Sequence, residues 1–313
     1  MYKVLSATPI EPTDGHVDLD FRDTDAWGPL EENGKIMPIM LGDEHAGPFV
    51  VLSCFPPMDE QMPLSFAHAH ASDNWRISIR GTTNMGKDSY AEGQFRFHDG
   101  GVPYASDNFA WGPDGGFGII MFADRRGFAI RPVKASIAEK VVPEQEAGGE
   151  ALGIDMMDPC PGAPAINTTL GRTERAHLDG GFESADSWPE LAPGVRFAAG
   201  LAGEPECGPV LVFIDADPGA EALPSRTLET EVLAAVVRGS VRADGDELDA
   251  ARVRLEEAET ESPPLVAGDD GVQLVAIVAD RRALASALAT GTLELPALRD
   301  ALAELQQDLQ PAS

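Results

Sequence analysis

Two histidines separated by one residue are the strongest candidates for chemistry in this chain. His68 and His70 stand in the segment FAHAHASDNWRISIRG and are two of only six histidines among 313 residues. On a β-strand, residues i and i+2 point to the same face, so the two imidazoles would lie side by side. Neutral imidazole is a common metal ligand, and the pair therefore indicates a metal site at the end of a strand.

The segment that begins with these histidines resembles the two sequence motifs of the cupin superfamily. The first family motif has the form G-x5-H-x-H-x3,4-E-x6-G, and the second has the form G-x5-P-x-G-x2-H-x3-N. The matching residues are His68, His70, Gly81, Gly93, Gly101 and Asn108. The resemblance is close over residues 68–108 and looser over the first 130 residues.

Four positions depart from the family motifs, and two of them are usual metal ligands. The departures are Met62 for the opening glycine, Asn74 for the glutamate, Asp99 for the proline, and Tyr104 for the histidine of the second motif. Of the four usual ligands, only His68 and His70 are retained.

Three arrangements of the site remain open. In the first, His68 and His70 bind a divalent metal, with Tyr104 or Asn74 as a weaker third ligand. A tyrosine phenolate is a hard oxygen donor, and it forms when a metal ion lowers the pKa of the phenol.

In the second arrangement, the strand is shifted by one residue, and Asp73 joins the two histidines. Two histidines and one carboxylate are the typical ligands of non-haem iron. A shift of one residue flips the faces of a strand, so Trp75, Ile77 and Ile79 would then line the barrel. In the third arrangement, no metal binds, and the pocket is a polar binding cavity.

The family register points Asn74 and Arg76 into the barrel. An inward Arg76 would bind a substrate carboxylate or phosphate as a fork, whereas an outward Arg76 would be a solvated or interface residue. Arg76 and Tyr104 are therefore the candidate catalytic residues, and Asn74 joins them as a candidate substrate-binding residue. His98, next to the second motif, is expected to be a structural histidine that faces a turn.

The resemblance implies a metal-dependent enzyme for a small organic substrate, above all a non-haem iron oxygenase. Fe(II) is the first choice of metal, and Zn, Mn, Ni or Cu are alternatives; lyase or isomerase activity comes next. One alternative is a non-catalytic ligand-binding or regulatory protein. Another is a metal-free isomerase, epimerase or lyase, with a histidine as base and Tyr104 as acid. No nucleotide cofactor is expected, because the glycine-rich residues 112–116 lack a phosphate-loop ending and precede a strand.

Short strands must position these residues. Alternating or continuous apolar patterns predict strands at residues 48–57, 74–80, 93–98, 116–123, 209–214, 232–242, 252–255 and 272–279. Numerous turns suit such strands, and the chain has 32 glycines and 25 prolines. Leucines near helical spacing over residues 281–309 predict one or two helices, broken near Gly291 and Pro296.

An internal repeat predicts two copies of one fold. Arg80-Gly81 recurs 158 residues later as Arg238-Gly239, and the ADRR of residues 123–126 recurs 156 residues later. At this offset His68 and His70 fall on Arg226 and Leu228, so the second copy is expected to hold no metal.

The repeat and the resemblance together predict an all-β bicupin: two cupin-like jelly-roll barrels with a C-terminal helical segment. The predicted parts are an N-terminal cupin domain with the site (1–140), a linker with short elements (141–195), a degenerate cupin domain (196–282) and C-terminal helices (283–313).

Net charge restricts the partners. With 23 Lys and Arg against 52 Asp and Glu, the formal charge is −29, which disfavours nucleic acid and anionic membranes. The first residues do not resemble a signal peptide, and no apolar stretch approaches the roughly 18 residues of a membrane span. We therefore expect a cytoplasmic protein. Its expected partners are a small substrate, which is anionic if Arg76 points inward, and a second copy of the chain in a homodimer.

Overall fold

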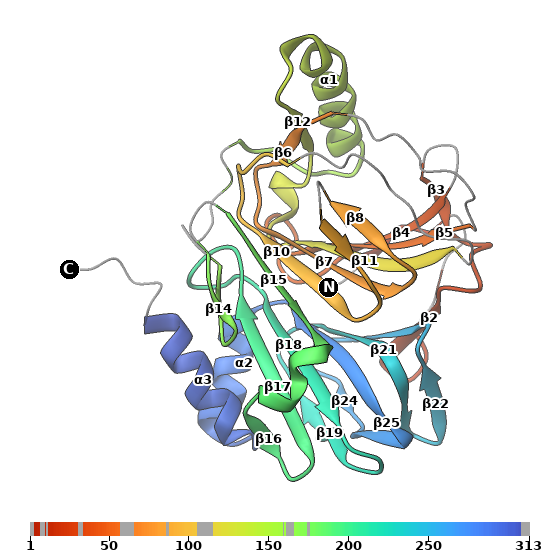
Figure 1. Cartoon of the computed structure of the whole chain (residues 1–313), viewed down its shortest axis with the longest axis vertical. Helices are drawn as coiled ribbons and strands as arrows, with labels where there is room; N and C mark the ends of the chain where they lie inside the picture. Colours follow the sequence, from red (N-terminus) through yellow and green to blue (C-terminus); the bar gives the residue numbers. More distant parts are fainter. Residues whose placement is uncertain are drawn as a thin grey trace.

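Two large antiparallel sheets, one above the other, form most of the molecule (Figure 1). The computed structural model describes residues 3–6, 10, 12–30, 34–56, 66–85, 88–104, 115–158, 160, 166–173 and 176–307. Asn108 and Met62 of the family motifs lie outside the described residues. No helix among the described residues is long and apolar enough to cross a membrane.

The first sheet has eight strands and carries the candidate site. Its order is β1 (Lys3–Val4), β4 (Gly34–Met40), β5 (Phe49–Phe55), β11 (Gly116–Phe122), β7 (Asn74–Arg80), β10 (Gln94–His98) and β15 (His177–Gly181), with β3 (Gly28–Leu30) paired to β4. Two small sheets accompany it: β6 (His68–His70) with β12 (Ile130–Pro132), and β8 (Thr83–Met85) with β9 (Asp88–Tyr90).

The second sheet has eleven strands. Its order is β14 (Gly171–Arg172), β13 (Asn167–Thr168), β17 (Val195–Leu201), β18 (Val210–Ala216), β25 (Leu265–Val278), β21 (Val232–Ala243), β23 (Arg252–Glu256) and β2 (His16–Asp20), with β16 (Glu190–Ala192), β19 (Glu221–Leu223) and β22 (Asp246–Asp249) paired alongside. A small sheet of β20 (Arg226–Thr227) and β24 (Glu261–Ser262) accompanies it.

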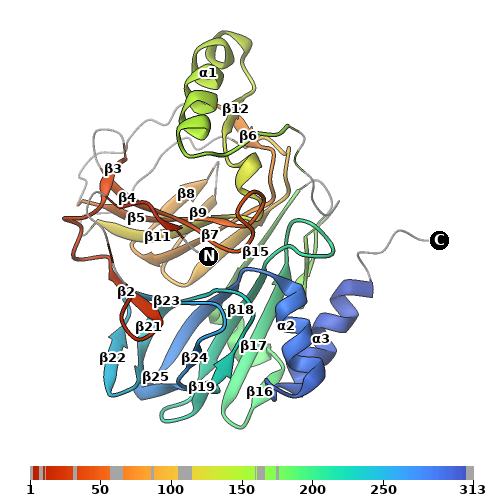
Figure 2. The same cartoon turned by 180° about the vertical axis from the view of Figure 1, so that it is seen from behind.

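In the part of the chain that the structure describes, three α-helices lie outside the sheets. Helix α1 (Ala135–Ala151) stands at the far end of the first half, and α2 (Arg281–Thr290) and α3 (Pro296–Gln307) lie beside the second sheet (Figure 2). The C-cap of α2 is Gly291 in the left-handed conformation, which ends the helix where the sequence predicts a break. Two short 3-10 helices, η2 (Arg125–Gly127) and η3 (Phe182–Ser187), complete the described elements. The predicted all-β fold with C-terminal helices is confirmed.

The two large sheets, each with the segments packed around it, are the first and second halves of the molecule. Each half completes its sheet with a strand that comes from the other half of the sequence. Strand β2, near the N-terminus, pairs with β23 of the second sheet, while β15 pairs with β10 of the first. No single cut in the sequence therefore separates the two sheets, although the sequence places residues 1–140 in one domain and 141–195 in a linker. The range predicted as a linker contains most of α1 and the whole of β15.

Equivalent ion pairs between an arginine and an aspartate hold the two exchanged strands, β2 and β15. Arg254 donates from Nε and Nη2 to the two oxygens of Asp18, at 2.8 and 2.7 Å. Arg96, 158 positions earlier, bonds both oxygens of Asp179 at 2.7 and 3.0 Å. The Arg96 and Arg254 side chains are only 4% and 1% exposed, so each arginine depends on carboxylates for charge compensation, and Asp88 is a second partner of Arg96.

The ADRR repeat has the same structural role in both halves. Arg125 bonds the carbonyl oxygens of Leu41, Glu44 and Gly47, and Arg281 bonds those of Ala202, Pro205 and Gly208. The preceding aspartate of each copy, Asp124 or Asp280, accepts from the backbone two residues on. The repeat found in the sequence is therefore a repeat of turn contacts.

The facing sides of the two sheets share one hydrophobic core. Phe213 of β18 stacks on Phe95 at 4.1 Å between ring centroids and contacts Trp75 edge-on at 5.6 Å. Ile77 and Ile79 belong to the same core. The shifted register, in which Trp75, Ile77 and Ile79 line the first barrel, is therefore wrong, because these side chains pack between the sheets.

Replacing Asp18 tests the strand exchange. In Asp18→Asn, the buried Arg254 loses its carboxylate, and we expect the free energy of unfolding to fall by roughly 1–3 kcal/mol. Urea unfolding of the intact chain measures this. Asp25→Asn, at an exposed position of the segment that follows β2, is the matched control and should change stability by less than about 0.5 kcal/mol. Equal effects of the two substitutions would contradict a stabilising role for the ion pair.

Candidate functional site

The hydroxyl of Tyr104 is the point at which the predicted site residues meet. The Nε2 atoms of His68 and His70 each lie 3.0 Å from the Tyr104 oxygen, and Nη2 of Arg76 donates to the same oxygen. Tyr104 reaches this position because its backbone forms a β-bridge with His68. Four residues that the sequence singles out are thus brought together.

Both histidines present a lone pair to that oxygen. Nδ1 of His68 lies 3.1 Å from the carbonyl oxygen of Phe66, and Nδ1 of His70 lies 2.6 Å from that of Phe128. A carbonyl oxygen only accepts, so both Nδ1 atoms carry the proton and both Nε2 atoms are acceptors. Burial lowers the pKa of both imidazoles, most strongly for His70, which keeps them neutral at pH 7.

The two Nε2 acceptors and the Tyr104 hydroxyl have one proton too few to satisfy both nitrogens. The Tyr104 hydroxyl has a single proton, which satisfies one of the two Nε2 lone pairs. Arg76 donates to the oxygen and so does not supply the second. A cation placed among the two nitrogens and the oxygen would satisfy all three, and two imidazoles with one phenol oxygen are a suitable ligand set for a divalent metal. The residues present therefore fit the metal that the family motifs imply.

Arg76 points inward, as the family register predicts. Its guanidinium carbon lies 4.6 Å from the centroid of the Tyr104 ring, and Nη1 donates to Oδ1 of Asn74 at 2.9 Å. Asn74 is 1% exposed, and its side-chain oxygen is turned toward Arg76. Burial raises the pKa of Tyr104, and the Arg76 charge partly opposes this shift.

Asp73 does not join this group, which corrects its assignment as a metal ligand. One of its oxygens accepts from the backbone N–H of Gly100 at 2.7 Å, and the other accepts from Gly203 of the second half at 3.0 Å. Glu231, 158 positions later, accepts in return from Gly42 of the first half at 3.0 Å. Two backbone donors hold the Asp73 carboxylate at the contact between the halves, so Asp73 fastens one half to the other.

His98 is the site residue to which sequence reasoning gave no functional role. Its ring lies 4.8 Å from the Tyr104 ring, and Nε2 lies 2.9 Å from the carbonyl oxygen of Val102 in the following turn. Burial lowers its pKa to about 4. The sequence pattern could have indicated this position. Because Phe95 and Phe97 alternate along β10, His98 must lie on the opposite face, beside Asn74 of β7.

The second half replaces this site with an internal ion pair. Arg226 and Ser262 are paired as His68 and Tyr104 are, 158 positions earlier. The Arg226 guanidinium bonds both oxygens of Glu256, and both side chains are 3% exposed. At this position of the second half, the buried guanidinium therefore supplies a positive charge from the protein itself.

Asp88, His177 and Asp179 form an exposed cluster close enough to hold a metal ion. Arg96 donates to Asp88 at 2.8 Å and to Asp179 at 2.7 Å, so both carboxylates are already compensated. His16 lies 3.8 Å from Asp18 in the second half, as His177 lies 3.8 Å from Asp179. This repetition favours a role in holding the exchanged strands.

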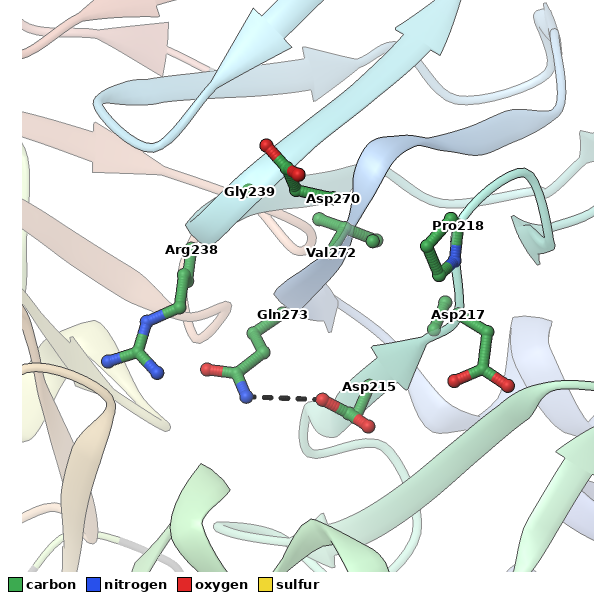
Figure 3. A pocket seen from close by; sticks show the side chains of 10 residues that line it. Asp215, Asp217, Pro218, Arg238, Gly239, Asp270, Val272 and Gln273 are labelled. Carbon is green, nitrogen blue, oxygen red and sulfur yellow. Dashed lines mark hydrogen bonds between the residues drawn. The ribbon is translucent and has the colours of Figure 1, made fainter.

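An open pocket of about 180 Å³ lies on the second half, lined by Asp215, Asp217, Asp270, Arg238 and Gln273 among others (Figure 3). Gln273 donates to Asp215 at 3.1 Å, and Arg196 also bonds that carboxylate, at 2.9 Å. The pocket contains no histidine and none of the residues around Tyr104, so we do not place the chemistry there.

The repeated strand pairings, turn contacts and strand-end bridges of two β-barrel halves, together with the motif residues around Tyr104, identify the architecture. The fold is that of a bicupin. No family model matches the chain, and no curated protein matches it significantly.

Several solved structures are similar to this chain at low identity. A deletion mutant of Bacillus subtilis oxalate decarboxylase is 13% identical, with 87% of this chain and 79% of that chain covered, at a TM-score of 0.47. A putative dioxygenase from Nostoc punctiforme is 12% identical, with 88% and 86% covered, at a TM-score of 0.49. AerE from Microcystis aeruginosa is 10% identical, with 81% and 95% covered, at a TM-score of 0.43. Likenesses this distant carry no argument about activity.

The buried Asp73 predicts a pH dependence of stability. Burial raises its pKa from 3.8 to about 6, so the folded protein binds this proton more tightly than the unfolded chain does. The free energy of unfolding should therefore fall as the pH rises from about 4 to about 6, by an amount of the order of 2 kcal/mol.

Urea unfolding at several pH values, compared between the wild type and Asp73→Asn, isolates this contribution. The variant lacks the titrating group, so its stability should change less over that range than the wild-type stability does. Parallel pH profiles would show that the proton on Asp73 does not contribute.

Proposed function

We propose that this chain is a metal-dependent enzyme that acts on a small anionic molecule in its first barrel. The observation that carries the proposal is the meeting of two neutral imidazole lone pairs and one phenol oxygen, with one proton too few among them. His68 and His70 would be ligands, and Tyr104 would be the third. The Arg76 guanidinium beside the phenol favours its ionised form, which is the form that a metal binds.

The nature of the donors supports iron as the first choice. Two imidazoles and one hard oxygen donor suit Fe(II), and Zn, Mn, Ni and Cu accept similar ligands. When bound, the ion would supply Lewis acidity and, in the case of iron, redox chemistry, for which a non-haem iron oxygenase is the activity we propose. The protein residues would hold the substrate beside it.

Arg76 is the group that would orient the substrate. A guanidinium donates two parallel hydrogen bonds to a carboxylate, which fixes both position and direction. In a protein with a formal charge of −29, this partly buried cation would provide the local attraction for an anion. The Phe66 and Phe128 carbonyls hold the two rings in one tautomer, and burial of His70 at 5% exposure limits access of water.

A second candidate function is metal-free acid–base catalysis. The contact that favours it is the bond from Arg76 to the Tyr104 oxygen, which places a positive charge beside the ligand set. In this case, Tyr104 donates its proton to the substrate, and the imidazole that lacks a hydrogen-bond donor accepts one, as in an isomerisation or epimerisation. Arg76 would hold the substrate anion in either case.

Metal analysis of the purified chain tests the first candidate. We expect about one equivalent of a divalent metal in the wild type, and more than a tenfold loss in His68→Ala and in His70→Ala. His45→Ala, in an exposed turn, is the matched control and should retain the metal. Chelator should lower the Tm of the wild type and of the control, because metal bound to the native state raises stability.

Unchanged metal content in His68→Ala and His70→Ala would contradict the proposed metal site.

Substitution of Tyr104 by phenylalanine separates the two candidates. Tyr104→Phe keeps the ring that packs against His68 and His98 but removes the oxygen ligand and the proton. If the enzyme is metal-dependent, metal affinity should fall about 10–100-fold, and added metal should restore part of the turnover. If catalysis is metal-free, turnover should be resistant to chelator in the wild type and lost in Tyr104→Phe at every metal concentration.

A further inference from the structure

We propose that His98 binds the ligand of the first barrel, and that this ligand is a small hydroxycarboxylic acid. The inference deepens the proposed function in one respect, since it rests on an anion being held beside Arg76. It does not need a metal. Its basis is a buried hydrogen-bond acceptor on His98 that none of the described residues satisfies.

The acceptor is Nδ1 of His98. The residue is 3% exposed, and Nε2 faces the carbonyl oxygen of Val102, which can only accept. Nε2 therefore carries the ring proton, and Nδ1 offers a lone pair. Nδ1 is buried and has no hydrogen-bond partner among the described residues. A buried polar atom without a partner is costly and calls for an explanation, such as a bound ligand, ion or water.

The position of His98 places this acceptor within reach of the same ligand as Arg76. On neighbouring strands β10 and β7, His98 faces Asn74, and Arg76 is two residues further along β7. Residues related in this diagonal way lie about 7–8 Å apart, and their side chains share one face of the sheet. The ring of Tyr104 contacts both: it lies 4.8 Å from the His98 ring and 4.6 Å from the Arg76 guanidinium carbon. A molecule that spans the two needs to be only a few atoms long.

The charges around His98 select a neutral donor. Arg76 and Arg96 lie opposite each other on β7 and β10 and share the face of the sheet that carries His98, so positive charge is disfavoured there. An ammonium group would face the same repulsion, so an amino acid is a poor fit. A hydroxyl donates a hydrogen bond without charge, while the carboxylate of the same molecule pairs with Arg76. Arg96 adds positive potential but is bonded to Asp88 and Asp179.

The second half has a different residue at the position equivalent to His98. The residue equivalent to His98 is Glu256, whose oxygens both accept from Arg226. The acceptor at this position is thus satisfied internally. In the first half, Arg226 is replaced by His68, which directs Nε2 to Tyr104 and Nδ1 to Phe66. Among the described residues, the acceptor at this position lacks a partner in the half that carries the site and is satisfied in the half that lacks it.

Matched pairs of acids test the proposal. The probes are glycolate against acetate and lactate against propionate, which differ by one hydroxyl, with Kd measured calorimetrically on chelator-treated protein. The wild type should bind each hydroxy acid at least about tenfold more tightly than its partner, because an unpaired buried acceptor penalises the acid without the hydroxyl. Arg76→Gln should weaken binding of all four acids.

Two substitutions of His98 separate ligand binding from a structural role. His98→Asn keeps an acceptor near the Nδ1 position but loses the bond to Val102, and it should retain preference for the hydroxy acids. His98→Gln can still donate to the carbonyl oxygen of Val102 but has no acceptor at the position of Nδ1. It should bind both members of each pair equally. Thermal unfolding of each variant confirms that it is folded before binding is measured.

The results of these experiments distinguish the inference about His98 from the proposed metal-dependent function. A wild type that binds none of the four acids, or binds both members of each pair alike, overturns the inference. So does the reverse pattern, in which His98→Gln keeps the preference and His98→Asn loses it, because that assigns His98 to holding the turn. Preference for hydroxy acids in a protein that never retains metal would support the inference while overturning the metal-dependent function.

Discussion

The shared core between the two sheets is the constraint on which the rest of the structure depends. Trp75, Phe95 and Phe97 of the first sheet pack against Phe213 of the second, so one face of β7 and β10 is committed to this contact. Because side chains alternate along a strand, the other face must carry Asn74, Arg76 and His98. Apolar packing between the halves thus decides which polar residues enter the first barrel.

The exchanged strands and the buried carboxylates make that packing reciprocal. Strand β2 crosses to the second sheet and β15 to the first, and each is held by a buried arginine. Asp73 and Glu231 each bond a glycine of the opposite half. The halves have nevertheless diverged in their interiors. One contains imidazoles, a phenol and an arginine, and the other contains the Arg226–Glu256 pair and apolar side chains.

The sequence was sufficient for the fold and for the residues around Tyr104. Period-two patterns located the main strands, and the ADRR repeat revealed the duplication that the turn contacts around Arg125 and Arg281 confirm. It was insufficient where a contact joins distant segments. Nothing local shows that β2 leaves its own half, or that the Asp73 carboxylate is taken by Gly203. His98 was interpreted as a structural histidine, because the residue that it faces, Asn74, lies on another strand.

We propose that a metal ion binds where the two Nε2 atoms and the Tyr104 oxygen meet. Anomalous scattering from crystals grown with a divalent transition metal would locate such an ion. We expect one strong peak about 2.0–2.2 Å from Nε2 of both His68 and His70. Absence of a peak there, or a peak only at the exposed cluster of Asp88, His177 and Asp179, would contradict it.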